Sequence, residues 1–226
     1  MNAELTSTLL LLSEQFNAVA DPEQAPGMKK YMKNLFPFLG IKKPIRSVAE
    51  KACIAECKKL PYDQLHEFIT ALWQKEEREY QYCALVLMEA ARMYKHEKSI
   101  ELFETLIATK SWWDTVDTIA SKCVGGYFKA FPEKKLPYIE RWMNSNNLWL
   151  QRTCLIFQLS YRDKTDVELF FACIDATSKS KEFFLQKAIG WALRQYARTN
   201  PGAVFEFVNN RELKPLSRRE ALKHFT

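Results

Sequence analysis

The segment Trp149-Leu150-Gln151-Arg152-Thr153-Cys154 has two counterparts in the chain, Glu79-Tyr80-Gln81-Tyr82-Cys83-Ala84 and Phe184-Leu185-Gln186-Lys187-Ala188-Ile189. Their glutamines lie at positions 81, 151 and 186, which gives spacings of 70 and 35 residues. Self-similarity at this period is typical of stacked helix pairs. The residues that mark tetratricopeptide repeats are absent, so a HEAT-like array is the better match. Chance register among leucine-rich helices is the alternative explanation.

Helical periodicity runs through almost the whole chain. Of 226 residues only 6 are glycine, and most of the 9 prolines fall between apolar periodic segments. We therefore expect an all-α fold, a right-handed α-solenoid of HEAT-like repeats with a concave basic groove. A single domain over residues 1–226 is the simplest organisation, with N-terminal helices over 1–36, the second of them basic, and the repeats over 44–226.

The spacing of apolar residues and of capping residues predicts where the helices lie. Thr165-x-x-Glu168 and Ser217-x-x-Glu220 fit the capping box, and Asn200-Pro201 and Asp21-Pro22 fit helix starts. The expected helices span 3–19, 22–35, 44–58, 62–75, 77–94, 99–109, 111–124, 134–144, 147–160, 166–178, 181–198, 201–210 and 217–225.

Cysteine, histidine and hydropathy patterns exclude several classes of protein. The six cysteines include no C-x-x-C pair and the three histidines are scattered, so we expect reduced thiols, no metal site and no cofactor. Neither a secretory signal nor a membrane-spanning run is evident, which favours a cytoplasmic protein with no membrane partner. Oligomeric state is left open by these patterns, and a monomer is compatible with them.

The formal net charge of +6 is basic without being extreme, and a lysine-rich surface alone would explain it. The basic residues nevertheless gather near both ends of the chain. Clusters of this kind can flank a phosphate-binding surface. They comprise Lys29, Lys30, Lys33, Lys42, Lys43 and Arg46, and then Arg211, Lys214, Arg218, Arg219 and Lys223.

The 35-residue period places charged residues at equivalent positions of successive repeats. Asp117, Arg152 and Lys187 are related by this period, and Tyr82 precedes them. Trp113 lies one helical turn before Asp117, and Trp191 one turn after Lys187. Because unpaired buried charge is costly, such a row is ill suited to packing between helices. We expect these side chains to line a groove, where an aromatic plane beside a carboxylate suits a flat cationic substrate.

With these motifs in order, the chain resembles the AlkD-type DNA alkylation repair glycosylases, a bacterial family of HEAT-like-repeat enzymes. The resemblance covers most of the length and depends on the order and spacing of several motifs together. These are Tyr31, Phe36-Pro37-Phe38-Leu39-Gly40-Ile41, Arg78-Glu79-Tyr80-Gln81, Trp112-Trp113-Asp114-x-Val116-Asp117, Trp149-Leu150-Gln151-Arg152, and Trp191 with Arg194.

The resemblance implies base excision repair: hydrolysis of the N-glycosidic bond of cationic N3- or N7-alkylated purines in duplex DNA, within the bacterial cytoplasm at the nucleoid. It assigns the lesion-contacting site to Asp117, Trp113, Trp191 and Arg152, and an approach to DNA to Tyr31. The family pattern has a polar uncharged residue where this chain has Lys42, and a lysine there can still meet a phosphate.

Each site residue also has a chemical reason to act, beside a structural alternative. The carboxylate of Asp117 would stabilise oxocarbenium character on the sugar; the alternative is that Asp117 is simply a residue on the surface of a helix. Trp113 and Trp191 would favour a cation, or are core residues, as we expect for Trp73, Trp142 and Trp112. Arg152 would clamp a phosphate, or forms a surface ion pair.

The remaining basic residues are expected to contact the DNA backbone: Lys29, Lys30, Lys33, Lys42, Lys187 and Arg194. No lysine stands out as a Schiff-base nucleophile, so we expect a monofunctional enzyme that leaves an abasic site. Since fold does not establish function, the alternatives are a catalytically silent HEAT-like protein that binds nucleic acid and a protein scaffold.

Overall fold

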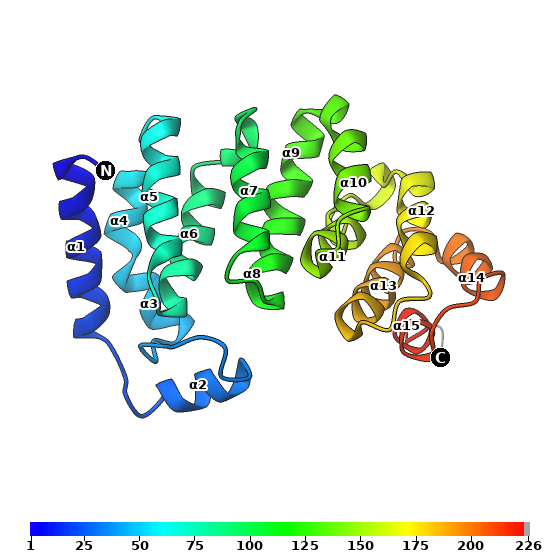
Figure 1. The fold of residues 1–226 in the computed structure, drawn as a ribbon, viewed down its shortest axis with the longest axis horizontal. Helices are drawn as coiled ribbons and strands as arrows, with labels where there is room; N and C mark the ends of the chain where they lie inside the picture. Colours follow the sequence, from blue (N-terminus) through cyan, green and yellow to red (C-terminus); the bar gives the residue numbers. More distant parts are fainter. Residues whose placement is uncertain (224–226) are drawn as a thin grey trace. The chain divides into compact units, whose positions relative to one another are not determined.

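The computed structural model describes residues 1–223, and every regular element within that range is a helix (Figure 1). The predicted all-α fold is confirmed. The chain divides into two compact units, Met1–His96 and the part from Glu97 onward, which we describe separately. The hand of the solenoid, its concave basic groove and a single domain over 1–226 remain predictions.

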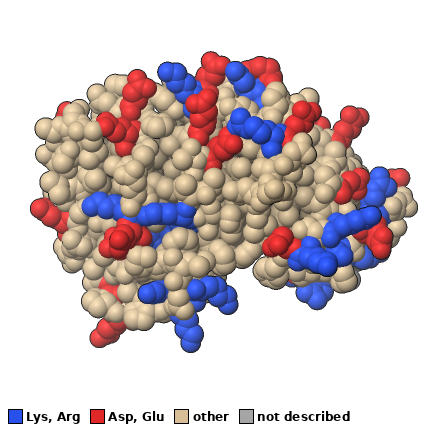
Figure 2. All heavy atoms as spheres, in the orientation of Figure 1, with Lys and Arg blue, Asp and Glu red and all other residues tan. Residues whose placement is uncertain are grey.

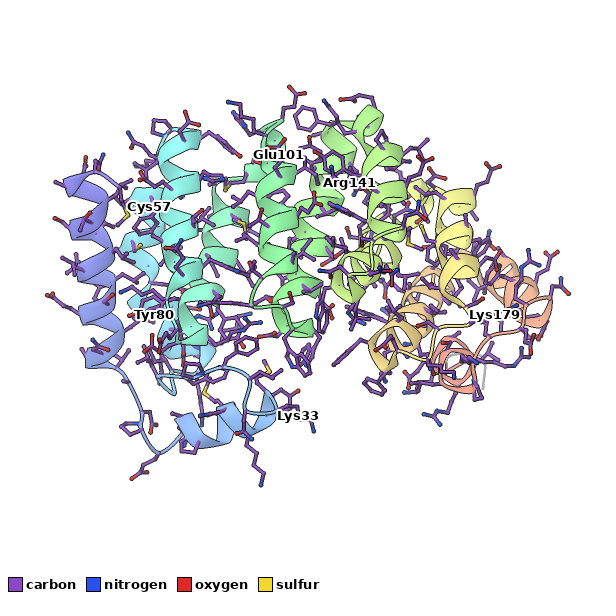
Figure 3. The ribbon with its side chains drawn as sticks, viewed as in Figure 1. Lys33, Cys57, Tyr80, Glu101, Arg141 and Lys179 are labelled. Carbon is purple, nitrogen blue, oxygen red and sulfur yellow. The ribbon has the colours of Figure 1, made fainter. Side chains whose placement is uncertain are left out.

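The first unit packs its helices around an apolar core to which α1 contributes Leu12 and Phe16, both fully buried. The ring of Phe16 lies 5.2 Å from the ring of Tyr80, a residue of α6 that is labelled in Figure 3. The helices of this unit are α1 (Ala3–Ala18), α2 (Ala25–Tyr31), α3 (Lys43–Ala49), α4 (Lys51–Cys57), α5 (Tyr62–Gln74), α6 (Arg78–Ala90) and the 3₁₀ turn η1 (Met93–Lys95).

Two helices of this unit are shorter than expected. The predicted helix over 22–35 is limited to α2, because Lys33 and Asn34 adopt left-handed backbone conformations with φ of 56° and 60°. The predicted helix over 44–58 is interrupted at Glu50, which separates α3 from α4. The basic residues near α2 therefore lie on a short helix and the turn after it.

A buried carboxylate fixes the loop that joins α2 to α3. Glu79 at the start of α6 accepts backbone N–H groups from Leu39, Gly40 and Ile41 at 2.9–3.1 Å. Gly40 has a φ of +84°, which favours glycine. The motif over residues 36–41 and Glu79 of the later motif thus have a structural role: together they fix this loop at the start of α6.

The second unit contains α7 (Ser99–Ala108), α8 (Trp113–Thr118), the π-helix η2 (Ile119–Val124), α9 (Gly125–Ala130), η3 (Pro132–Lys134), α10 (Lys135–Met143), α11 (Leu148–Ile156), η4 (Arg162–Lys164), α12 (Val167–Thr177), α13 (Phe183–Tyr196), α14 (Pro201–Asn209) and α15 (Pro215–Ala221). The helix expected over 111–124 continues to Ala130, so its predicted end was wrong. The helix expected over 217–225 begins at Pro215 instead, and its last two residues lie outside the described part.

The repeat found in the sequence corresponds to a repeated structural role. Each of the three glutamines donates its side-chain N–H groups to main-chain carbonyls six to nine residues earlier, at the end of the preceding helix or in the turn just after it. The acceptors are Leu72, Trp73 and Lys75 for Gln81, Met143 and Ser145 for Gln151, and Ser180 for Gln186. The carbonyls at a helix end lack partners within the helix, so this contact closes each helix pair.

The capping predictions were confirmed in part. Asn200 caps α14 by accepting the N–H of Ala203 at 3.0 Å. Asp166, rather than Thr165, caps α12. Ser217 lies inside α15, where its hydroxyl donates to the carbonyl of Gln186 at 3.1 Å, so the second capping box was wrong.

Predictions about the core also hold. Trp73 and Trp142 are buried, and all six cysteines are buried free thiols, among them Cys57 of α4 (Figure 3). Among the helices described for residues 1–223, none has the length and apolar character needed to cross a membrane.

Candidate nucleic-acid interface

The second unit brings Asp117 and Arg152 into direct contact. Asp117 lies near the end of α8 and Arg152 at the middle of α11, one repeat later. The guanidinium donates from Nε to Asp117 Oδ1 at 2.7 Å and from Nη2 to Oδ2 at 2.8 Å. This is a bidentate pair with one hydrogen bond to each carboxylate oxygen. The two residues that the 35-residue period relates are therefore in direct contact.

A third bond connects this pair to α13, because Arg152 Nη1 donates to the carbonyl oxygen of Phe184 at 2.6 Å. The Arg152 side chain is 5% exposed and that of Asp117 is 17% exposed. Arg152 thus binds Asp117 and the start of α13 and presents little surface of its own. As it stands, it orients the carboxylate, which differs from the phosphate clamp expected from the sequence.

Burial raises the pKa of Asp117 above its ordinary value of 3.8, while the hydrogen bonds and charge of Arg152 act in the opposite direction. The charge of neighbouring Asp114 adds to the increase. Asp117 is therefore a largely buried carboxylate that is paired with one cation, Arg152.

Trp113 and Trp191 are both partly exposed, so neither indole is buried between helices. Trp113 begins α8 one turn before Asp117, and Trp191 lies on α13 seven residues after Phe184, on the same helical face. Because α8, α11 and α13 are joined through Arg152, both tryptophans belong to helices that the Asp117–Arg152 pair connects.

An aromatic cluster supports the same three helices. The ring of Trp112 lies 5.7 Å from that of Trp149 and 4.9 Å from that of Phe184. Trp112 was predicted to be a core residue like Trp73 and Trp142; it packs against these rings but is only half-buried. This cluster therefore packs the residue immediately before Trp113 against α11 and α13.

Lys187 and Arg194 both pair with Glu220, which the sequence analysis had assigned to a capping box. Glu220 of α15 accepts from Arg194 Nη1 at 2.7 Å and pairs with Lys187 Nζ at 3.2 Å and Lys223 Nζ at 2.9 Å. Contact with Lys223 first, and then with Arg194 and Lys187, lowers the pKa of Glu220 to about 2 despite burial. Its assignment to a capping box had concealed this role.

The remaining predicted DNA contacts belong to the first unit. Tyr31, at the end of α2, has an exposed side chain, as do Lys29, Lys30, Lys33 and Lys42. Figure 2 shows Lys and Arg atoms gathered over α2 within this unit, and Figure 3 labels Lys33 in the turn that follows it. These residues form a locally basic surface, and their role in binding stays a prediction.

Comparison with known proteins decides the family. A sequence profile described as DNA alkylation repair enzyme matches residues 12–225. The chain belongs to this family. A solved structure from Enterococcus faecalis, described as a predicted DNA alkylation repair enzyme, is 35% identical with a TM-score of 0.86, covering 92% of this chain and 97% of that one.

A more distant structure supports the fold. AlkD2 from Streptococcus mutans is 17% identical with a TM-score of 0.62, covering 77% of this chain and 87% of that one. No curated protein sequence matched the chain. Membership of the DNA alkylation repair enzymes implies an enzymatic role in repairing alkylation damage, with DNA as the partner.

Proposed function

We propose that this DNA alkylation repair enzyme is a monofunctional glycosylase. It hydrolyses the N-glycosidic bond of cationic N3- or N7-alkylated purines in duplex DNA and leaves an abasic site. The observation that carries the proposal is the Asp117 carboxylate, which accepts two hydrogen bonds from Arg152, is only partly exposed, and is accompanied on neighbouring helices by two partly exposed indoles.

The chemistry needs a fixed negative charge near the anomeric carbon. As the bond to the alkylated base lengthens, positive charge develops on the deoxyribose, and a preorganised carboxylate stabilises it. Arg152 occupies one lone-pair site on each oxygen of Asp117, so each oxygen keeps a further site for the attacking water. The same pair can therefore stabilise the sugar and orient the nucleophile.

Cationic bases are favoured by the aromatic residues at this site. The faces of Trp113 and Trp191 attract positive charge by about 0.5–2 kcal/mol each when the contact is made. A neutral purine gains none of this. An alkylated purine is also a better leaving group because it departs as a neutral base. Both effects direct the reaction towards N3- and N7-alkylated lesions.

The monofunctional assignment follows from the residues available around Asp117. A lyase would need an amine that can attack the sugar carbon. Lys187, the equivalent residue one repeat beyond Arg152, is already paired with Glu220. We propose separately that Lys187 and Arg194, which remain partly exposed beside Glu220, contact the phosphate backbone, as do Tyr31, Lys29, Lys30, Lys33 and Lys42 of the first unit.

The test uses duplex DNA with a single 7-methylguanine and follows free base and strand breaks separately. The proposal predicts release of 7-methylguanine together with a strand that breaks only after alkali treatment. DNA binding without base release would support a catalytically silent binder. Absence of salt-dependent DNA binding would support a scaffold. Strand cleavage without alkali would contradict the monofunctional assignment.

A further inference from the structure

The helix that carries Asp117 contains a π-helical turn immediately after this residue. Residues 113–130 form one continuous helical stretch in which η2 separates α8 from α9. The N–H of Gly125 donates to the carbonyl of Ala120, five residues earlier, as a π turn requires. Turns of this kind are frequent at functional sites, but a physical reason for this one is found in the packing.

Apart from Gly125, the buried residues along this stretch recur in pairs every four positions. The pairs are Thr115 and Val116, Ile119 and Ala120, Cys123 and Val124, and Tyr127 and Phe128. In an α-helix a four-residue step rotates the buried face by about 40°, so three steps would turn it by about 120°. One inserted residue offsets about 100° of that rotation. The π turn thus keeps both ends of the stretch packed on the same neighbours.

The helix α11 and the segment after it contact this stretch at two levels. At the first level, Arg152 binds Asp117. At the second, a side chain on Gly125 would place its Cβ 2.4 Å from the carbonyl oxygen of Phe157, so only glycine fits. The Tyr161 hydroxyl donates to the carbonyl oxygen of Gly125 at 2.7 Å within the buried interior.

Tyr161 is itself held firmly. Its ring meets that of Phe157 edge-on at 5.8 Å, and the ammonium of Lys129 on α9 lies 4.2 Å from its centroid. Burial raises the pKa of its phenol, so the group remains a hydrogen-bond donor at neutral pH. Ser121, inside the π turn, donates to the backbone carbonyl of Asp117 at 2.7 Å. A chain of contacts therefore leads from Tyr161 through the π turn to Asp117.

We propose that Tyr161 is a positioning residue for Asp117: its hydrogen bond to Gly125 locks the π turn that directs the carboxylate onto Arg152. This inference rests on the proposed function for its catalytic consequence, but its structural part does not. Without the hydroxyl, the π turn loses the hydrogen bond that ties it to the segment after α11. The Asp117–Arg152 bonds then open more often while the apolar packing remains.

The experiment compares Tyr161→Phe with Tyr127→Phe. Tyr127 is a matched control because it lies on α9, is fully buried, and also donates its hydroxyl to a main-chain carbonyl at 2.7 Å, that of Glu97. Both substitutions remove one buried hydroxyl and leave the ring. NMR would measure exchange of the Arg152 Nε proton with water, and single-turnover assays would measure release of 7-methylguanine.

For Tyr161→Phe we expect Arg152 Nε–H exchange to accelerate about fivefold and base release to slow by a similar factor, as loss of one hydrogen bond implies. DNA affinity should stay within about twofold of wild type. Tyr127→Phe should leave Arg152 exchange and base release at wild-type values. Equal behaviour of the two variants in both measurements would overturn the inference.

Ser121→Ala provides a second variant if Tyr161→Phe folds poorly, and it should accelerate Arg152 exchange in the same direction. Unchanged exchange in that variant would count against the inference. If wild-type protein releases no base, the proposed function fails while the exchange comparison still decides whether Tyr161 positions Asp117.

Discussion

At the scale of single residues, the proposed chemistry depends on how Asp117 is held. Its partner Arg152 is nearly inaccessible, and both carboxylate oxygens are engaged. Removing one member of a buried pair leaves the other charge without compensation, which costs far more than losing a surface pair. The chain offers an internal comparison, because Asp175 and Arg211 form an Asp–Arg pair across one repeat on the surface.

Arg152→Gln should therefore lower the free energy of unfolding by about 3 kcal/mol, since the Asp117 carboxylate would remain without its cation. Arg211→Gln should cost less than about 1 kcal/mol, since its pair with Asp175 is exposed. Urea denaturation of both variants measures the two values. Equal losses would mean that the Asp117–Arg152 pair behaves as a surface contact.

The pKa of Asp117 gives a prediction about pH. Because burial raises this pKa above 3.8, the carboxylate takes up a proton at a higher pH than an ordinary aspartate does. The enzyme-dependent rate of base release should fall as the pH is lowered through that pKa, because only the ionised form stabilises the sugar cation. A rate profile from pH 7 to pH 4 measures it. An acid limb that persists unchanged in Asp117→Asn would assign the titration to another group.

The stability effect of the same shift has the opposite sense. A carboxylate whose pKa is higher in the folded protein binds protons more strongly there than in the unfolded chain. Between 3.8 and the higher folded-state value, the contribution of Asp117 to stability therefore declines as the pH rises. Activity and stability thus favour opposite protonation states of this residue.

At the scale of helices, the close approach of α13 and α15 determines where Lys187, Trp191 and Arg194 lie. A side chain at Gly190 would place its Cβ 2.3 Å from Glu220 Cβ and 2.9 Å from the carbonyl oxygen of Ser217. The two helices therefore meet almost backbone to backbone. Glu220 then lies within reach of both cations of α13.

Gly190→Ala should destabilise the protein by about 1–3 kcal/mol, because α15 must move and overpacking outweighs the gain in helix propensity. Gly202→Ala is the control: its added Cβ would meet only Asn200 Oδ1, at 3.8 Å. It should be neutral or stabilising by up to about 1 kcal/mol. Thermal unfolding compares them, and a neutral Gly190→Ala would contradict the described helix contact.

Sequence patterns predicted the helices better than their ends. The period of 35 residues placed Gln81, Gln151 and Gln186 in equivalent roles, and the structure gives them the same capping contact. The stretch after Val124 was missed because an α-helical period does not fit residues buried every four positions. Glu220 was missed because its three cations come partly from another helix, which no local pattern reveals.

At the scale of the whole molecule, family membership establishes alkylation repair, while the site proposal depends on single side chains. The prediction that Asp117 and Arg152 lie close together was correct, because the 35-residue period relates their positions. The sequence could not show that the guanidinium of Arg152 is already hydrogen-bonded within the protein, since its bond to the Phe184 carbonyl depends on how α11 and α13 pack. The surface near α2 is basic because its lysines are exposed, and its binding of DNA stays a prediction.

If that surface binds DNA, its lysines should determine the salt dependence of affinity. Replacing Lys29, Lys30 and Lys33 together by alanine should reduce the slope of log affinity against log salt by roughly 0.9 for each phosphate that is no longer neutralised. Lys134→Ala is the control, because Lys134 is already paired with Glu97. Fluorescence anisotropy at several salt concentrations measures both slopes. An unchanged slope in the triple variant would remove α2 from the interface.

The role of the Asp117 carboxylate in base removal has one decisive test. Single-turnover release of 7-methylguanine from duplex DNA is compared among wild type, Asp117→Asn and Asp175→Asn, with folding and DNA binding checked for each. We expect a loss of roughly 10²–10³ in rate for Asp117→Asn, as for removal of one preorganised electrostatic group, and a wild-type rate for Asp175→Asn. Base release at the wild-type rate by folded Asp117→Asn would show that this carboxylate does not carry the reaction.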